Sequence, residues 1–549
     1  MKTSQASYWH AAQEVELESL AKHDVWELVP RKAAGNNPVI TNRWVFAVKK
    51  NETGYVKRFK ARLVVHGYKQ QYGINYTETY ASVIRFDTIR VAIYYAVQRG
   101  WVVLQYDVKT AFLHAVLNEH VFMEQPQGFM FKGNSFICRL KKALYGLKQA
   151  PHEWLKTLHR QLTSIGFERC DSDHGLYILK QRGEIIMLLT VYVDDLLLMG
   201  TPETCKRIAQ QLETAFELVF LGPVKYLLGV DITIDYVQRT VFFCQENYIK
   251  EILKRFHMEN CNGVATPESE TITEVDENEE KPSMDSTLPY REIVGALQYL
   301  VSGSRPDLAH VVRSLGQFMS CYNTQHYARA RRVLRYLKST MDHGLLLKVK
   351  QDESIKLLQV YSDADYANNK DDRKSISGYV TMIDGSVISY GSRKQGINAQ
   401  STMEAEYVAM NEGARDLMWL KGLCEELQWH YEGAMLRGDN QAALYLSEKP
   451  GKHSKTKHIE NKYHYVRDLV ERDEVKTSHC GTEEMIADIM TKGLGRVKFQ
   501  KFRSMMQVIP REEVLLSGET VGVAGQTLTN KESQKKSNNE LVIYVCNYK

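Results

Sequence analysis

The chain alternates between apolar stretches with a strand-like pattern and stretches with a helix-like pattern. Apolar runs rich in β-branched and aromatic residues predict strands, and apolar positions three and four residues apart predict helices. Over the first half of the chain, both patterns are present in a mixed order. The predicted elements are strands at 43–48 and 62–65 joined by a turn at 51–54, a helix at 87–98, a strand at 101–106, strands centred on 194–195, a helix at 203–216, strands at 226–233 and 240–244, and a basic helix at 247–256.

A change of composition opens the second half. Residues 262–289 are rich in acidic residues and have prolines at both ends, which is typical of a solvated linker. Residues 290–340 look helical and include a basic stretch, either a solvated helix face or a nucleic-acid contact. Beyond about 512 the periodicity is lost, which predicts a disordered tail. The basic residues are Arg329, Arg331, Arg332, Arg335 and Lys338, and the later elements are strands at 357–362, 378–383 and 386–390, a helix at 403–420, and strand–helix steps at 436–447 and 475–492.

Composition narrows the class of protein without identifying a partner. With 549 residues the chain is too long for one hydrophobic core, so several subdomains are expected. The formal net charge of +5 neither demonstrates nor excludes a nucleic-acid partner. The nine cysteines include no Cys-x-x-Cys pair, which argues against a zinc ribbon or a disulfide framework. Neither a signal peptide nor a membrane span is predicted, so we expect a soluble intracellular protein.

Two neighbouring aspartates carry the clearest chemical signal. Asp194 and Asp195 stand between apolar runs at 185–191 and 196–199, which predicts a hairpin with both carboxylates at its tip. Neighbouring carboxylates repel each other, and a hard divalent cation removes that cost. The alternative is an acidic turn on the surface.

A third aspartate, Asp107, follows the strand predicted at 101–106. It is either the N-cap of a helix that begins near Thr110 or a partner of the first two aspartates. Three carboxylates at strand ends suit a two-metal phosphoryl-transfer site.

Four segments, in order, resemble the reverse transcriptases of copia-type LTR retrotransposon Pol polyproteins. Residues 105–113, 144–151 and 192–195 (Tyr-Val-Asp-Asp) are similar to successive palm motifs, and residues 58–64 to a fingers segment. The resemblance extends from about Trp9 to Leu494. It implies an α+β fold, with a right-hand polymerase of fingers, palm and thumb followed by a connection region and an α/β ribonuclease H-like domain. It also implies an RNA-directed DNA polymerase with ribonuclease H activity.

The resemblance assigns roles in the polymerase residue by residue. It makes Asp107, Asp194 and Asp195 the catalytic metal ligands. Lys60 and Arg62 are implied to contact the incoming triphosphate, where a positive fork suits phosphate oxygens, with a solvated strand face as the alternative.

Three aromatic residues complete the implied substrate-binding set. Phe112 stands where the family carries a bulky ring that excludes a 2′-hydroxyl, and its alternative is a core aromatic. Tyr145 falls where the family packs a side chain beside the nucleotide, and Tyr192 precedes the aspartate pair. Residues 226–229 resemble a primer-grip hairpin.

Among the acidic residues after residue 356, four stand on predicted strands and helices or at their ends, in the order Asp, Glu, Asp, Asp. With the predicted order of strands and helices, this is similar to the ribonuclease H fold. The resemblance implies that four carboxylates hold two magnesium ions for hydrolysis of RNA in an RNA–DNA hybrid. The four acids are Asp363, Glu406, Asp439 and Asp488.

Some neighbouring residues are alternatives to these ligands. Glu404 and Glu406 are about 200° apart on a helix, so only one can face the metals. We choose Glu406, because its Glu-x-x-Ala context resembles other ribonucleases H, and Asp365 is interpreted as a neighbour. A zinc site at His453, His458 and His464 is disfavoured, since no cysteine accompanies them.

These inferences lead to a division of the chain and a set of partners. We expect Mg²⁺ as the cofactor, with Mn²⁺ as an alternative. The expected partners are an RNA template, a DNA primer, the RNA–DNA hybrid and deoxynucleoside triphosphates, with no membrane and an open oligomeric state. The expected division is 1–25 lead-in, 26–261 reverse transcriptase, 262–289 acidic linker, 290–350 helical connection, 355–495 ribonuclease H-like domain and 496–549 C-terminal extension.

The sequence contains no zinc knuckle, protease or integrase motif. We therefore expect a polyprotein fragment or a truncated copy, located in the cytoplasm, in virus-like particles or in the nucleus. The alternative function is a catalytically inactive remnant that only binds nucleic acid.

Overall fold

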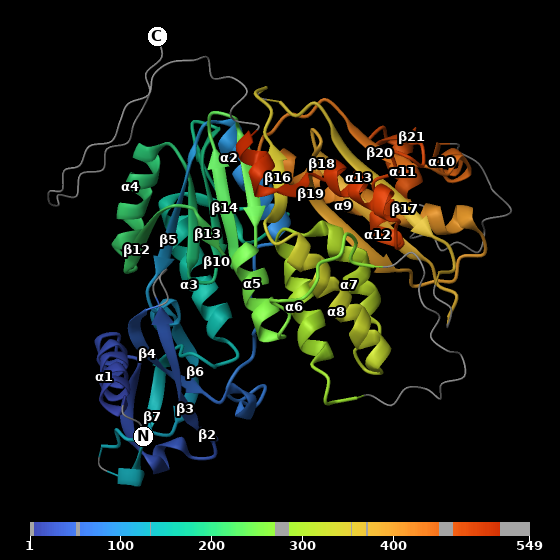
Figure 1. The fold of residues 1–549 in the computed structure, drawn as a ribbon. Coiled ribbons are helices and arrows are strands. Elements are labelled where there is room, and N and C mark those ends of the chain that lie inside the picture. The colour runs from blue at the N-terminus through green and yellow to red at the C-terminus, as the bar shows by residue number, and fades with distance from the viewer. Residues whose placement is uncertain are drawn as a thin grey trace, which may run out of the picture.

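The structure is a computed structural model that describes residues 5–50, 55–131, 133–268, 285–352, 354–368, 372–448 and 465–516. The described strands form a six-stranded sheet, two five-stranded sheets, a four-stranded sheet and a separate hairpin. Figure 1 shows the N-terminal part at the lower left, the six-stranded sheet above it and the C-terminal α/β part at the upper right. The fold class is therefore α+β, with a polymerase hand joined to a ribonuclease H-like module.

The N-terminal part forms the fingers. Helix α1 (Ala6–Lys22), which sequence analysis missed, packs against β4 (Val56–Val65), and β4 pairs antiparallel with β3 (Asn42–Lys50). The turn predicted at 51–54 lies outside the described residues. A four-stranded sheet completes this part, with β1 (Trp26–Pro30), β7 (Phe136–Lys142), β6 (Val116–Met123) and β2 (Val39–Ile40) in that order.

The palm is a six-stranded sheet covered on both faces. Leu197 and Met199 pack in the core on the side of α2, whereas Leu196 and Leu198 pack in the core on the side of α3 and α4. Burial on both faces explains why these strands are apolar without alternation. The elements are α2 (Phe86–Gln98), β5 (Val102–Val108), α3 (Ala150–Ile165), β8 (Phe167–Arg169), β9 (Leu176–Gln181), β10 (Glu184–Tyr192), β11 (Asp195–Gly200), α4 (Pro202–Glu213) and β12 (Leu218–Pro223), with strand order β12-β5-β11-β10-β9-β8.

The third sheet joins distant parts of the chain. Its order is β13-β14-β15-β16-β22, so two strands after residue 342 pair beside three strands before residue 245. The strand predicted at 226–233 is interrupted, because Leu228 and Gly229 have φ of 49° and 73° and form a turn. The strands are β13 (Tyr226–Leu227), β14 (Val230–Asp235), β15 (Thr240–Cys244), β16 (His343–Lys348) and β22 (Val508–Pro510).

Four helices lie together beside this sheet (Figure 1). The basic stretch lies on the last of these helices, α8 (Thr324–Ser339), and contacts the segment before residue 269. Arg329 donates to Glu268 at 2.7 Å, and Arg335 donates to the carbonyl oxygen of Asn262 at 2.8 Å. Glu268 is therefore packed against α8. The prediction that it belongs to a solvated linker is wrong for this residue. The helices are α5 (Glu246–Arg255), α6 (Tyr290–Gly303), α7 (Ala309–Gly316) and α8 (Thr324–Ser339).

The C-terminal module is a five-stranded sheet with order β19-β18-β17-β20-β21. Strand β17 pairs antiparallel with β18 and parallel with β20, and the long helix α9 packs on β17 and β18. This is the ribonuclease H-like arrangement expected from the order of elements. They are β17 (Leu358–Asp365), β18 (Ile376–Ile383), β19 (Ser386–Lys394), α9 (Thr402–Glu426), β20 (Ala434–Gly438), α10 (Gln441–Glu448), α11 (Tyr465–Glu471), β21 (Lys476–His479) and α12 (Asp488–Thr491).

The modules share apolar packing. One buried cluster includes Ile84, beside α2, and Val508, near the C-terminal end of the described chain. Helices α13 (Arg496–Met505) and α14 (Arg511–Leu516) follow, so the loss of structure predicted at 512 is wrong up to 516. Residues 269–284 and 517–549 lie outside the described residues, and the predicted domain boundaries stay predictions. Within the described ranges, no helix has the length and apolarity needed to cross a membrane.

Candidate active sites

The first carboxylate group lies at one end of the palm sheet. Strands β5 and β11 place Asp107 directly opposite Asp195, and Tyr192 pairs with Asp195 across a two-residue turn that contains Asp194. Asp107 lies inside β5, and the N-cap of the following 3₁₀ helix (Ala111–His114) is Thr110. The helix-cap interpretation of Asp107 is therefore wrong, and the fold brings all three aspartates to one edge.

The tip of this hairpin is strained and held in place. Val193 has a φ of 57°, a conformation that is unusual for a β-branched residue. The indole N–H of the buried Trp154, on α3, donates to the carbonyl oxygen of Val193 at 2.6 Å. Strained backbone of this kind persists only where the surrounding structure holds it.

The electrostatics of the palm aspartates suit a cation. Burial raises the pKa of Asp107 and of Asp195, and the charge of Asp194 raises both further. The positive charges of Lys60 and Arg62 lower the pKa of Asp107 and so oppose this effect. Carboxylate oxygens that repel one another at a half-buried site fit a divalent metal with oxygen ligands.

Basic and aromatic side chains lie near these aspartates. The guanidinium of Arg62 lies over the ring of Tyr145, 4.8 Å from its centroid. Phe112 and Tyr145 make an edge contact with ring centroids 5.0 Å apart. Phe112 also packs at the edge of the fingers–palm core, so both interpretations of this ring remain open. Tyr192, the last residue of β10, is half-buried.

A close backbone contact positions the fingers strand over this site. The amide of Val65 donates to the carbonyl oxygen of Tyr145 at 2.8 Å. A Cβ on Gly146, which has a φ of 95°, would lie 2.2 Å from the carbonyl oxygen of Val65. Glycine is therefore required at position 146, where β4 contacts the segment 144–146. This contact brings Arg62, on β4, to Tyr145.

The second carboxylate group lies in the C-terminal module. One oxygen from each of Asp363 on β17, Glu406 on α9 and Asp439 just after β20 lies within 4.8 Å of the others. In the described part of the chain, this is the one group of three or more side chains spaced for a metal. Asp363 and Glu406 are 2% and 4% exposed. Unlike these acids, the palm aspartates do not meet the same spacing.

The fourth acid, Asp488, is held by lysines. Its two oxygens lie 2.8 Å from Lys492 and 2.7 Å from Lys498. Lys492 also lies 3.7 Å from Asp363, whose carboxylate accepts a hydrogen bond from the hydroxyl of Thr491. The structure therefore places Asp488 beside the cluster but satisfies its charge with ammonium groups.

Burial dominates the electrostatics of this cluster. It raises the pKa of Asp363, Glu406 and Asp439, and repulsion among the carboxylates adds to the effect, while Lys492 opposes it. Two buried carboxylates and one half-buried carboxylate, with one shared ammonium neighbour, are costly as a charged group. Their oxygen donor set therefore fits a divalent cation such as Mg²⁺.

The structure separates the two glutamates of α9. Glu406 joins the acidic cluster, whereas Glu404 accepts a hydrogen bond from the amide of Gln400 at 2.7 Å and is buried. Glu404 follows Ser401, the N-cap of α9, by three residues. Its carboxylate therefore helps to cap the N-terminus of α9. Asp365 accepts a hydrogen bond from Asn368 and lies outside the cluster.

Several residues of both sites were missed from the sequence. Gln105 donates to Asp195 at 3.3 Å, and it precedes Asp107 by two positions on the same strand face, a spacing that offers a signal. Lys492, four residues after Asp488 on a helical turn, offers a similar one. Trp154 offers none. The histidines considered for zinc, at 453, 458 and 464, lie outside the described residues.

Comparisons with known proteins agree with the motifs. The family model described as reverse transcriptase (RNA-dependent DNA polymerase) matches residues 23–270. The chain is 37% identical over 504 residues to the retrovirus-related Pol polyprotein from transposon RE2 of Arabidopsis thaliana, covering 91% of this chain and 34% of that protein. It is 35% identical over 505 residues to the corresponding polyprotein from transposon TNT 1-94 of Nicotiana tabacum, covering 90% of this chain and 37% of the relative.

A shorter relative is covered completely. The Ty5-1 transposon protein of Saccharomyces cerevisiae is 31% identical over 316 residues, which is 57% of this chain and 100% of that protein. The chain spans about a third of the two plant polyproteins. Among solved structures, a foamy viral protease–reverse transcriptase in complex with double-stranded DNA is similar with a TM-score of 0.45 and 14% identity, covering 86% of this chain and 83% of that one.

Proposed function

Because the chain belongs to the reverse transcriptase family of copia-type retrotransposon Pol polyproteins, we propose that it copies RNA into DNA and degrades the RNA strand of the resulting hybrid. The observation that carries the polymerase proposal is the pairing of Asp107 with Asp195 beside Asp194. The acidic cluster of the C-terminal module favours the second activity, hydrolysis of RNA.

In the polymerase site, each side chain has a task. Lys60 and Arg62 bind the triphosphate of the incoming deoxynucleotide, and the contact of Arg62 with Tyr145 holds the guanidinium near Asp107. Phe112, supported by the ring of Tyr145, excludes a 2′-hydroxyl. The indole of Trp154 keeps the hairpin tip, and therefore Asp194, in place.

Both carboxylate groups would hold divalent metal ions. Bound Mg²⁺, or Mn²⁺ as the alternative ion, would supply Lewis-acid activation of the attacking oxygen and neutralise charge on the phosphates. In the nuclease site, Asp363, Glu406 and Asp439 would hold the metal. The hydroxyl of Thr491 orients Asp363, and Lys492 forms an ion pair with Asp488 beside them.

A direct experiment tests both activities on one preparation. The full chain is given a homopolymer RNA template with a DNA primer, deoxynucleoside triphosphates and Mg²⁺, and a separate RNA–DNA hybrid labelled on the RNA. We expect primer extension and RNA cleavage, both abolished by a chelator and restored by Mg²⁺. A folded protein that binds the hybrid but neither extends nor cleaves would be the inactive remnant, the alternative function.

A further inference from the structure

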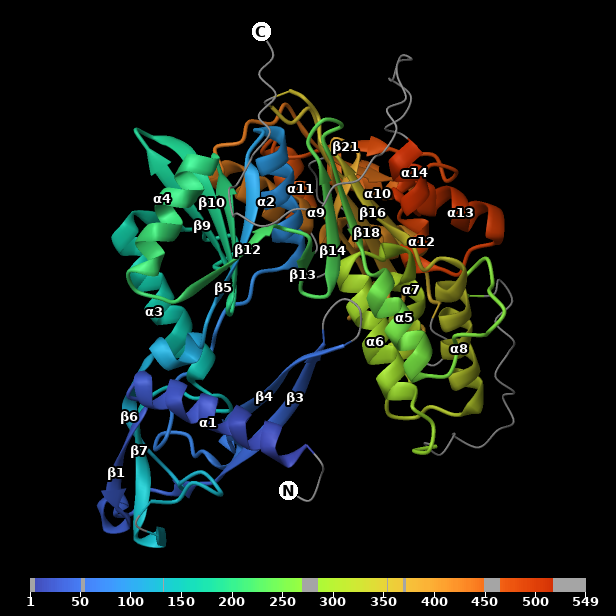
Figure 2. The same ribbon diagram turned by 60° about the vertical axis from the view of Figure 1, so that its left-hand side comes forward.

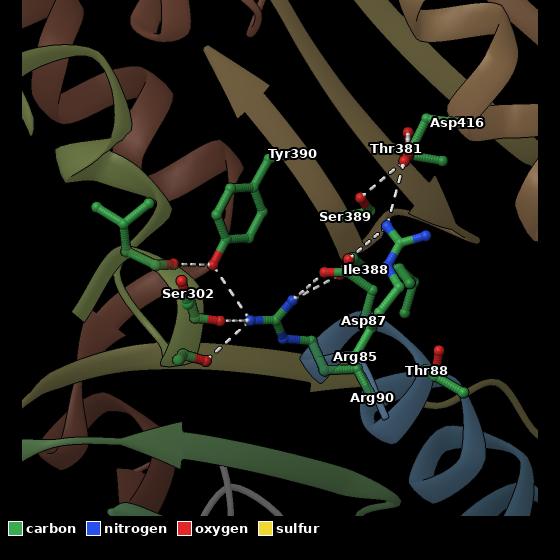
Figure 3. Close-up of polar contacts among 12 residues, drawn as sticks. Arg85, Asp87, Thr88, Arg90, Ser302, Thr381, Ile388, Ser389, Tyr390 and Asp416 are labelled. Carbon is green, nitrogen blue, oxygen red and sulfur yellow. Dashed lines mark hydrogen bonds and ion pairs between the residues drawn. The ribbon is translucent and has the colours of Figure 1, made fainter. Parts of the chain in front are cut away.

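One buried arginine contacts three parts of the chain where the palm meets the ribonuclease H-like module. Arg90 lies on α2, and only 1% of its surface is exposed. Its guanidinium donates to the carbonyl oxygen of Ile388 on β19 at 2.8 Å. It also donates to the carbonyl oxygens of Ser302 and Gly303, at the end of α6, at 2.7 and 2.9 Å. Figure 3 shows these contacts converging on Arg90.

Two more side chains complete the environment of this guanidinium. Asp87, one turn earlier on α2, forms an ion pair with Arg90 at 2.9 Å. The hydroxyl of Tyr390 accepts a hydrogen bond from Arg90 at 3.1 Å and donates one to the carbonyl oxygen of Val301. A buried charge is tolerated only when it is paired and hydrogen-bonded. A side chain without N–H donors here would remove the hydrogen bonds to these three carbonyl groups.

The contacts of Arg90 with β19 and with the end of α6 form the joint between the palm and the ribonuclease H-like module. A second set of contacts surrounds this joint. Arg85 stacks on Trp419 of α9, with the guanidinium carbon 4.1 Å from the ring centroid. The indole of Trp419 donates to the carbonyl oxygen of Ser172 in the palm at 3.2 Å. At the end of α9, the carboxylate of Glu426 accepts hydrogen bonds from the amides of Asp171 and Ser172 at 2.6 and 2.8 Å. The palm therefore docks on the module through polar contacts with defined geometry.

The joint is connected to each carboxylate group through packed or paired elements. Helix α2 packs on β5 and β11, the strands that carry Asp107 and Asp195. Strand β19 pairs with β18, which pairs with β17 and Asp363. In Figure 2, α2 lies between the palm sheet and the C-terminal module. A shift at Arg90 would therefore change the position of one group relative to the other.

We propose that Arg90 is a positioning residue that fixes the palm, the end of α6 and the ribonuclease H-like module in one arrangement. The RNA of a hybrid leaving the polymerase site is then cut at one fixed distance behind the primer 3′ end. This proposal rests on the proposed function of the two sites. The hydrogen-bond partners of Arg90 described above include no residue of either carboxylate group, so its effect is on where the RNA is cut.

The test maps cut positions in three variants of the full chain. A DNA primer is annealed to end-labelled RNA, and the cuts are measured from the primer 3′ end. Arg90→Met keeps the apolar stem without charge or donors, and Arg90→Lys keeps the charge. Arg99→Met is the matched control, because Arg99 follows the same helix and stacks on Tyr95 and Trp101 in the palm.

We expect the wild-type protein and Arg99→Met to give the same narrow cluster of cuts. Arg90→Met should spread or shift the cuts by several nucleotides, and Arg90→Lys should restore part of the wild-type pattern. Hydrogen exchange provides a readout that needs no activity. Loss of the Arg90 contacts should raise amide exchange in residues 301–305 and 387–391 by about tenfold or more.

Wild-type cut positions in folded Arg90→Met would overturn the proposal, whether or not exchange increases. If Arg90→Met does not fold, Tyr390→Phe removes the hydroxyl between Arg90 and Val301 and is judged by the same two readouts. If the wild-type protein neither extends nor cleaves, the proposed function fails. Hydrogen exchange alone then tests whether Arg90 fixes the arrangement of the modules. Unchanged amide exchange in Arg90→Met overturns the proposal.

Discussion

The indole N–H of Trp154 donates to the carbonyl oxygen of Val193 at 2.6 Å, which joins α3 to the tip of the hairpin that carries Asp194 and Asp195. Because Val193 has a positive φ, the tip depends on this contact. Trp154→Phe removes the donor and leaves the half-buried carbonyl group of Val193 without it, so primer extension should fall by about tenfold. Hybrid cleavage, measured on the same preparation, should remain. Unchanged extension by a folded variant would contradict this role.

Asp194→Asn should abolish DNA synthesis while leaving RNA cleavage largely intact. The two carboxylate groups lie on different sheets, so removing charge at one does not disturb the ligands of the other. Loss of a metal ligand costs on the order of 3 kcal/mol or more, so extension should fall below about 1% of wild type. Primer extension and hybrid cleavage check this outcome. Substantial residual extension would count against the site.

Phe112→Ala tests the ring beside the nucleotide. If the ring excludes a 2′-hydroxyl, the variant should incorporate more ribonucleotide relative to deoxyribonucleotide. Phe112→Tyr, which retains the ring, is the control and should keep the discrimination. The measurement is the ratio of incorporation from matched ribonucleotide and deoxyribonucleotide pools. An unchanged ratio in a folded Phe112→Ala variant would make Phe112 a core residue.

Glu406→Gln should stop cleavage of the RNA strand, because it removes a charge from the acidic cluster while keeping its size. Glu404→Gln is the matched control on the same helix. Its amide oxygen can still accept the hydrogen bond from Gln400, so cleavage should change little. Polymerisation should continue in both variants. If neither substitution affects hybrid cleavage, the nuclease assignment fails.

Asp416 links the stability of the C-terminal module to pH. Burial, with a contribution from Asp87, raises the pKa of Asp416 to about 6, although hydrogen bonds from Thr381 and Ser389 oppose the shift. A carboxyl group with a raised pKa in the folded state stabilises the fold below its unfolded pKa. That stability is lost as the pH rises from about 4 through 6.

Asp416→Asn cannot ionise and should not show this loss. Between pH 4 and pH 7, the free energy of unfolding of the variant should therefore improve relative to wild type by about 2–3 kcal/mol. Urea unfolding at several pH values measures the difference. Parallel pH dependences for the two proteins would contradict the assignment.

The local pattern of the sequence determined much of both sites. Apolar runs on either side of Asp194 and Asp195 were sufficient to predict the hairpin, because a strand buried on both faces is apolar throughout. The spacing of Glu404 and Glu406 on a helix showed that only one of them can face the metals, since helical geometry depends only on neighbouring residues, and the resemblance to ribonucleases H led to the choice of Glu406. The order of strands and helices after residue 356, with the same resemblance, predicted the ribonuclease H-like sheet.

Only the tertiary structure decided which distant residues support these sites. Neither the hydrogen bond from Trp154 to Val193 nor the contacts of Arg90 with β19 and the end of α6 have a signature in the local pattern, because each joins elements far apart in the sequence. For the same reason, the sequence left the basic stretch at Arg329 open between a solvated helix face and a nucleic-acid contact and placed Glu268 in a solvated linker, yet the two residues form an ion pair. Charge and periodicity are local properties, whereas the partner that satisfies a buried polar group is chosen by how the elements pack.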